Sequence, residues 1–233
     1  MNVLNFCYKS IFIMNFDQAR DNMVLNQLRA NRIRDMSLIE KIEIFPRESL
    51  YPIKYKHLSY SDRIITLNDG RFILPPLTAF HLVQALEINE NDYVLEVGSG
   101  FGTTTSIINQ FTSMIDCIET SMEMIESFQL SIEEKIFKAN LLKTTIDEFF
   151  DDESLNLKKY QKILINGTLD QEPLNIIKNS SKDAQIVCVI DNKEFKHKIV
   201  KYLKVKGNCN RFIVDEASSS FIYKFIKKEP FVF

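Results

Sequence analysis

The segment YVLEVGSGFG, residues 93–102, constrains the fold of this chain more than any other stretch. It begins as an apolar run, which predicts a buried strand, and it ends in three glycines at alternating positions, Gly98, Gly100 and Gly102. Glycine lets the backbone turn sharply and approach a ligand where any Cβ would collide. Residues 103–110 then have a helical pattern. A strand, a glycine turn and a helix N-terminus together form a nucleotide-binding element, because free backbone N–H groups face the ligand there.

The spacing of the glycines indicates which nucleotide is bound. Dinucleotide-binding turns run Gly-x-Gly-x-x-Gly, whereas this turn runs Gly-x-Gly-x-Gly around Ser99, with Glu96 two residues ahead of the first glycine. This pattern is typical of S-adenosylmethionine (SAM) sites, where an acidic residue near the turn can help to hold the ammonium group. Glu119 ends a second apolar stretch, where a carboxylate would accept both ribose hydroxyls. The alternatives are a glycine turn in an ordinary α/β domain and an NAD-linked oxidoreductase, against which the glycine spacing argues.

Length, charge and cysteine spacing limit the number of domains, the partners and the metal sites that we expect. A chain of 233 residues with 45% hydrophobic residues can bury one sizeable core, so we expect a single domain. The net charge of −2 provides no global field to recruit nucleic acid or an anionic membrane. The cysteines have no pair at metal-ligand spacing, so we expect no metal and buried, reduced thiols in a cytoplasmic protein. They are Cys7, Cys117, Cys188 and Cys209.

The N-terminal third is predicted to be a helical cap followed by a loop. Residues 1–14 are predicted to be a disordered extension. Their apolar patch is too short for a transmembrane helix. Within residues 15–90, helical patterns cover residues 19–32, 37–44 and 77–86. Between the last two helices, residues 60–76 have no helical period and contain an Asn-Asp-Gly turn. Loops of this length are commonly functional.

Residues 91–233 are predicted to form the cofactor-binding sheet. Apolar strands alternate with helical segments, which predicts a parallel sheet. The predicted strands after the glycine turn are residues 114–118, 135–140, 162–166 and 184–190, and the predicted helices are 122–130, 144–150 and 173–179. After Asp191 come strand-like pieces with short turns, residues 196–205, 210–214 and 221–226, which predict an antiparallel C-terminal section.

Several segments in one order carry a family resemblance. They are FPRESLYP, YSDR with the following Gly70, ALEINENDYVLEVGSGFG, IET around Glu119, and KILINGT followed by Pro173. From about Met23 to the C-terminus the chain resembles the protein-L-isoaspartate O-methyltransferases, repair enzymes that use SAM to esterify the abnormal carboxyl of isoaspartyl residues. The resemblance implies an α/β, Rossmann-like SAM-dependent methyltransferase fold, with a mostly parallel sheet, an antiparallel C-terminal section and an N-terminal helical cap.

The chain departs from this family in the loop before the glycine strand. The family reads Gly-Gln-Thr-Ile-Ser-x-Pro, and its Ser acts at the substrate carboxylate, whereas residues 70–76 here read GRFILPP. Leu74 replaces the Ser and Phe72 the Thr. An alkyl group donates no hydrogen bond, so a carboxylate there loses a partner, at a cost of about 1–3 kcal/mol. The family's acidic residue near the adenine falls at Asn140, and the Asp that opens the fourth strand falls at Gln161.

These residues predict a SAM-dependent protein carboxyl methyltransferase that takes isoaspartyl proteins or peptides and acts as a monomer, without nucleic-acid or membrane partners. The catalytic residue stays open because Leu74 holds the family's Ser position. The substrate loop is assigned to Gly70, Ile73 and Leu74, of which Ile73 and Leu74 line the entry for the side chain. The cofactor is assigned to Glu96, Gly98, Ser99, Gly100, Gly102, Glu119 and Asn140. The alternative is a SAM-binding regulator or adaptor that has this fold but has lost repair activity.

Overall fold

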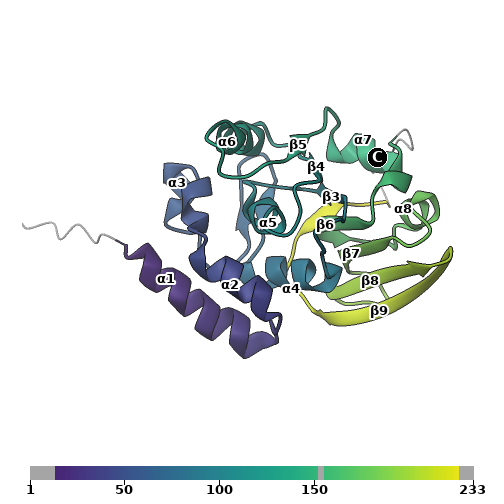
Figure 1. The fold of residues 1–233 in the computed structure, drawn as a ribbon, viewed down its shortest axis with the longest axis horizontal. Coiled ribbons are helices and arrows are strands. Elements are labelled where there is room, and N and C mark those ends of the chain that lie inside the picture. The colour runs from purple at the N-terminus through teal and green to yellow at the C-terminus, as the bar shows by residue number, and fades with distance from the viewer. Residues whose placement is uncertain (1–13, 152–154, 226–233) are drawn as a thin grey trace, which may run out of the picture.

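A computed structural model describes residues 14–151 and 155–225, so the predicted extension over residues 1–14 lies outside them except for Met14. An eight-stranded sheet is covered by helices on both faces (Figure 1). The helices are α1 (Phe16–Asn22), α2 (Met36–Ile44), α3 (Ile53–Lys56), α4 (Pro76–Leu86), α5 (Thr103–Ile108), α6 (Met122–Glu133), α7 (Ile146–Asp151) and α8 (Leu174–Asn179). The strands are β1 (Ile65–Thr66), β2 (Phe72–Ile73), β3 (Val94–Val97), β4 (Ile115–Ile118), β5 (Asn140–Leu141), β6 (Lys162–Leu169), β7 (Gln185–Ile190), β8 (Lys198–Val205), β9 (Asn208–Glu216) and β10 (Phe221–Tyr223).

The strand order β5-β4-β3-β6-β7-β8-β9 confirms the predicted sheet. The first five strands are parallel, and β8 and β9 are antiparallel to their neighbours. One core lies between the sheet and α2, α4, α5 and α6, and a second lies between the sheet and α7 and α8. Strands β3 and β7 are therefore buried along their whole length, which explains why they are apolar except for Glu96 and Gln185.

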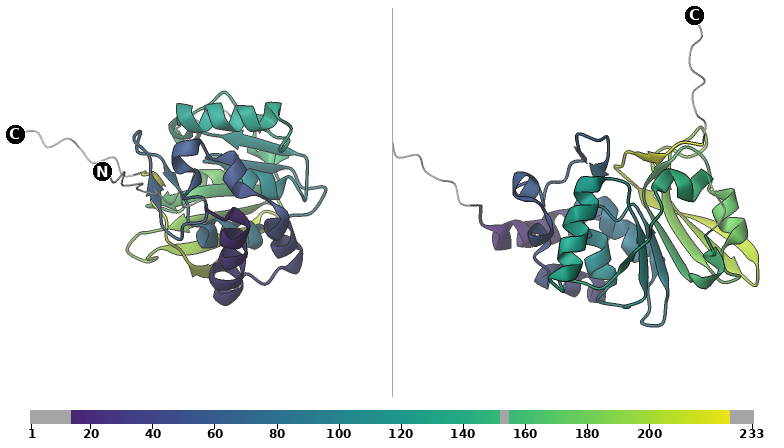
Figure 2. Two further views of the ribbon diagram at one scale, coloured as in Figure 1. Left: turned by 90° about the vertical axis from the view of Figure 1, so that its left-hand side faces the viewer. Right: turned by 90° about the horizontal axis from the view of Figure 1, so that it is seen from above.

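The first two helices of the N-terminal cap, α1 and α2, pack on the first core, where Figure 2 shows them beside α4 and α5. The helix predicted over residues 19–32 is α1 continued by a π-helical turn, Met23–Leu28, and a 3-10 turn. Asn15 caps α1 by accepting a hydrogen bond from the backbone of Gln18. This first helical segment of the cap ends at Arg32, whose φ of 70° reverses the chain into α2.

The structure differs from the sequence-based expectation at three places in the chain. The loop over residues 60–76 contains a short hairpin, β1 with β2, around the predicted turn. The strand expected over residues 135–140 is reduced to β5, because the preceding Phe137 packs on the ring of Phe128 instead. Strand β10 lies parallel to β6 rather than antiparallel. β6 continues to Leu169, whereas β3 stops opposite Ile165, which leaves the end of β6 free for β10.

The cysteines are only partly as expected. Cys117 and Cys188 are buried in β4 and β7, whereas Cys209 is exposed, because it lies in the outer strand β9. Cys7 lies outside the described residues. Among the helices of the described segments, none has the length and apolar character needed to cross a bilayer.

Candidate functional site

Strands β3 and β4 end together at one edge of the sheet, beside Ile165 of the longer strand β6. Val97 of β3 is in register with Ile118 of β4 and with Ile165 of β6. The residues that follow these three positions, Gly98, Glu119 and Asn166, therefore emerge side by side. In open α/β sheets, ligands bind outside the carboxyl ends of the strands.

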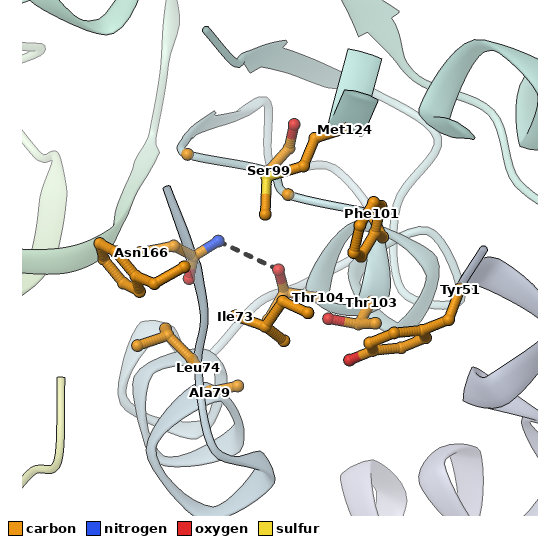
Figure 3. A pocket seen from close by; sticks show the side chains of 13 residues that line it. Tyr51, Ile73, Leu74, Ala79, Ser99, Phe101, Thr103, Thr104, Met124 and Asn166 are labelled. Atoms are coloured by element: carbon orange, nitrogen blue, oxygen red, sulfur yellow. Dashed lines mark hydrogen bonds between the residues drawn. The ribbon is translucent and has the colours of Figure 1, made fainter. Parts of the chain in front are cut away.

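A cavity lies at this edge, with about 350 Å³ of empty space that includes its opening to solvent, and we call it the inner cavity (Figure 3). The glycine turn supplies Gly98, Ser99 and Gly100, and the loop before it supplies Phe72, Ile73 and Leu74. The structure thus brings the predicted cofactor turn and the predicted substrate loop to one cavity. Asn166, Tyr51 and Met124 complete much of its wall.

The three glycines of the turn differ in what surrounds them. All have positive φ, of 82°, 58° and 86° for Gly98, Gly100 and Gly102. A Cβ on Gly102 would lie 2.6 Å from the ring of Phe137, so this glycine is required by packing. A Cβ on Gly100 would meet no atom closer than 4.0 Å, so the space beside it is open to a ligand.

Glu96 lies beneath the turn and is fully buried. Its carboxylate accepts hydrogen bonds from Thr105 Oγ1 at 2.6 Å, from Asn166 Nδ2 at 2.6 Å and from the hydroxyl of Thr104. Burial raises the pKa of Glu96, although these hydrogen bonds act in the opposite direction. Because Glu96 does not line the inner cavity, its visible role is to tie the end of β3 to α5 and β6.

Two buried polar atoms in the wall of the inner cavity have no partner among the described residues, Ser99 Oγ and Asn166 Oδ1. The amide nitrogen of Asn166 is fixed by Glu96 and by Thr104 Oγ1 at 3.0 Å, so its oxygen is left as an acceptor (Figure 3). Buried polar groups normally find partners. The pair therefore fits a polar ligand with both donors and acceptors, such as an amino-acid group.

Glu119 is buried at the end of β4 and is held by Arg71. Arg71 Nε and Nη2 each donate to one carboxylate oxygen at 2.8 Å. The backbone N–H groups of Gly100, Thr120 and Ser121 donate to the same carboxylate at 2.8, 2.8 and 3.1 Å. Burial alone would raise the pKa of Glu119, but Arg71 and these N–H groups hold it below the usual value.

A second, more open cavity of about 910 Å³ lies beyond this ion pair, and we call it the outer cavity. It is lined by Gly70, Arg71, Ser121, Met122, Ile146 and Ile222, among others. The predicted loop residue Gly70 therefore belongs to the outer cavity, and Ile73 and Leu74 to the inner one.

The residues at this edge fit SAM at the amino-acid end. The open space beside Gly100 and the unpartnered atoms of Ser99 and Asn166 match a zwitterionic group. Glu119 is predicted to accept the ribose hydroxyls, and a diol can reach its carboxylate only where the guanidinium of Arg71 now lies.

The position of Asn140 gives no support to the predicted adenine contact. Asn140 is in register with Asp116, three residues before Glu119, and its Nδ2 donates to Asp116 Oδ1 at 3.1 Å. It lines neither cavity. Gln161, at the start of β6, accepts a hydrogen bond from the backbone N–H of Tyr93 at 2.9 Å, which is a structural contact.

Sequence reasoning missed three residues of this site. Asn166 comes directly after three apolar residues of the run KILIN, Ile163 to Ile165, and this change from apolar to polar is a usable signal. Arg71 and Tyr51 had no such signal, because their contacts depend on how loops far apart in the chain meet.

Known proteins resemble this chain in sequence. The family model described as protein-L-isoaspartate(D-aspartate) O-methyltransferase (PCMT) matches residues 19–222. A protein-L-isoaspartate O-methyltransferase of Klebsiella pneumoniae is 21% identical over 211 residues, which are 90% of this chain and 97% of that protein. Another, from Rhodopseudomonas palustris, is 29% identical over 104 residues, covering 45% of this chain and 42% of the relative. In this and several similar alignments, the chain spans about half the length of the relative.

Solved structures share the fold. A protein of Plasmodium falciparum, assigned as a protein-L-isoaspartate O-methyltransferase and crystallised with S-adenosyl-L-homocysteine, has a TM-score of 0.69 at 14% identity. The superposition covers 90% of this chain and 99% of that one. The match of the family model over most of the chain, together with the shared fold, shows that this chain belongs to the protein-L-isoaspartate(D-aspartate) O-methyltransferase family.

Proposed function

We propose that this protein is a SAM-dependent methyltransferase that esterifies a carboxylate of a protein or peptide, of the isoaspartyl type. The observation that carries the proposal is the inner cavity, where the glycine turn and the loop with Ile73 and Leu74 meet. Family membership supplies the class of reaction. When bound, SAM supplies an electrophilic methyl group.

The side chains around the inner cavity are suited to align and desolvate an acceptor. A carboxylate is already ionised at neutral pH, so the reaction needs orientation and exclusion of water more than a base. Phe72, Leu74 and Met124 provide apolar walls. Glu96 acts indirectly in this proposal, by fixing the amide of Asn166.

Leu74 cannot donate a hydrogen bond to the acceptor carboxylate, so another donor is needed. Tyr51 is buried, and its ring extends into the inner cavity (Figure 3). Arg47 Nη2 donates to the Tyr51 hydroxyl at 2.8 Å, which leaves the phenolic proton free to be donated. We assign Tyr51 as the donor that orients the carboxylate.

The test combines binding with transfer. SAM binding is measured by calorimetry, and methyl transfer is measured with an isoaspartyl peptide and its normal aspartyl twin. Binding with transfer to the isoaspartyl peptide alone supports the proposal. SAM binding without transfer to either peptide across neutral pH favours the alternative, a SAM-binding regulator or adaptor, for which the alkyl group of Leu74 is the specific observation.

The predicted setting belongs to the same proposal. The protein is a monomer in the cytoplasm that acts on protein substrates, and the net charge of −2 provides no global field to recruit nucleic acid or an anionic membrane. Sedimentation of the purified protein tests the monomeric state.

A further inference from the structure

The guanidinium of Arg71 stands between the inner and outer cavities. Its Nη2 lies 3.2 Å from the position that a Cβ on Gly98 would take, next to the inner cavity. Arg71 itself lines the outer cavity. A ligand that reaches from Ser99 in one cavity to Ser121 in the other must therefore pass the place that this side chain occupies.

The carboxylate of Glu119 has no acceptor site left. Two oxygens offer about four lone-pair sites, and five N–H groups are directed at them, two from Arg71 and one each from Gly100, Thr120 and Ser121. The backbone donors are fixed by the glycine turn and by the start of α6. Only the bonds from Arg71 can be given up without moving the backbone.

We propose that Arg71 is a built-in competitor of the cofactor ribose, which closes the SAM site by pairing with Glu119 and must swing away before the cofactor binds. The proposal rests on the SAM dependence proposed above. Only molecules in which Arg71 has swung away can bind SAM. The apparent affinity for SAM is therefore the affinity of the open form multiplied by the fraction of molecules that are open.

Two features allow the side chain to move by itself. The backbone of the hairpin stays closed through the bond from Leu67 N to Arg71 O at 2.7 Å and that from Arg71 N to Asp69 Oδ1 at 3.0 Å. The third guanidinium nitrogen, Nη1, is buried and has no partner among the described residues. The closed position therefore leaves one donor unsatisfied, and this donor gains a partner when the side chain turns towards water.

The test uses Arg71→Met, which keeps the length of the stem without the charge, and Arg63→Met as the matched control. Arg63 lies in the same loop and is exposed. Its side chain makes no hydrogen bond or ion pair with the described residues. We expect Arg71→Met to bind S-adenosylhomocysteine at least about tenfold more tightly than wild type, because Glu119 then awaits the ribose without a competitor. Arg63→Met should keep the wild-type dissociation constant.

A second readout uses the wild-type protein, in case Arg71→Met folds poorly. The NMR signal of the Arg71 Nε–H group, assigned by its loss in Arg71→Lys, should shift when S-adenosylhomocysteine is added. The Arg63 signal should stay in place.

The outcomes separate this proposal from the proposed function. Equal affinity of wild type and Arg71→Met, with no shift of the Arg71 signal, overturns the competitor and leaves SAM dependence intact. Binding by Arg71→Met but not by wild type supports it in its strongest form. If neither protein binds, the site is not a SAM site and both proposals fail.

Discussion

The buried carboxyl of Glu96 makes the stability of this fold depend on pH, and Thr105→Val tests how. Thr105 is fully buried, and its Oγ1 donates to Glu96 Oε2 at 2.6 Å. Valine has nearly the same shape, so the change removes a donor without opening a cavity. A hydrogen bond to a charged group contributes about 1.5–3 kcal/mol, and one to a neutral group about 1 kcal/mol.

The sign of the pH effect follows from the raised pKa of Glu96. A carboxyl whose pKa rises on folding adds stability below its unfolded pKa of about 4.3, and this contribution is lost as the pH rises through the folded pKa. Losing the hydroxyl of Thr105 raises the folded pKa further. We therefore expect Thr105→Val to lower the free energy of unfolding by about 1 kcal/mol near pH 4.5 and by about 1.5–3 kcal/mol near pH 8.

The assay is urea unfolding at both pH values, with Thr112→Val as the control. Thr112 is also buried, but its hydroxyl donates to the neutral backbone carbonyl of Asp92 at 2.9 Å. Thr112→Val should lower the free energy of unfolding by the same amount at both pH values. An equal cost of Thr105→Val at the two pH values would refute the reasoning that Glu96 ionises inside the fold.

Five further substitutions probe the site. Glu119→Ala should weaken SAM binding by about 1.5–3 kcal/mol in calorimetry, because ribose hydroxyls lose a charged acceptor; unchanged affinity contradicts the assignment. Gly100→Ala should stay folded by circular dichroism but lose SAM binding, whereas Gly102→Ala should lose about 1–3 kcal/mol of unfolding free energy through its clash with Phe137; the reverse order of effects would contradict the geometry. Tyr51→Phe should lower transfer to isoaspartyl peptide about tenfold with little change in SAM affinity, and Leu74→Ser should raise transfer only modestly; wild-type transfer by Tyr51→Phe rules out its hydroxyl as the donor.

Local sequence was sufficient for the framework of the fold. The apolar runs of β3 and β7 and the glycine turn are signals that neighbouring residues carry by themselves. The hairpin of β1 and β2 was missed because each strand has only two residues, which is too short for a period to show. The direction of β10 was missed because it depends on β6 outrunning β3, which is a property of the assembled sheet.

The candidate site likewise contains residues that local sequence predicts and residues whose contacts depend on the assembled fold. The place of the glycines and of Glu119 at the strand ends could be predicted from spacing, since these residues follow the strands that position them. The partner of Glu119 could not, because Arg71 lies 48 positions away and reaches it only through the hairpin turn. Asn140 was placed by analogy, and the register of β5 with β4 put it beside Asp116 instead.

Strand β9 has a consequence for how the protein behaves at high concentration. As the outer strand it presents a row of backbone groups that another chain can pair with. The register shift between Ile199 and Val200 leaves Val214 as an extra residue and breaks this row. The exposed apolar run of β9, Phe212 to Val214, is bounded by Arg211 and Asp215. The colloidal stability of the protein thus depends on one irregularity and two charges in its outermost strand.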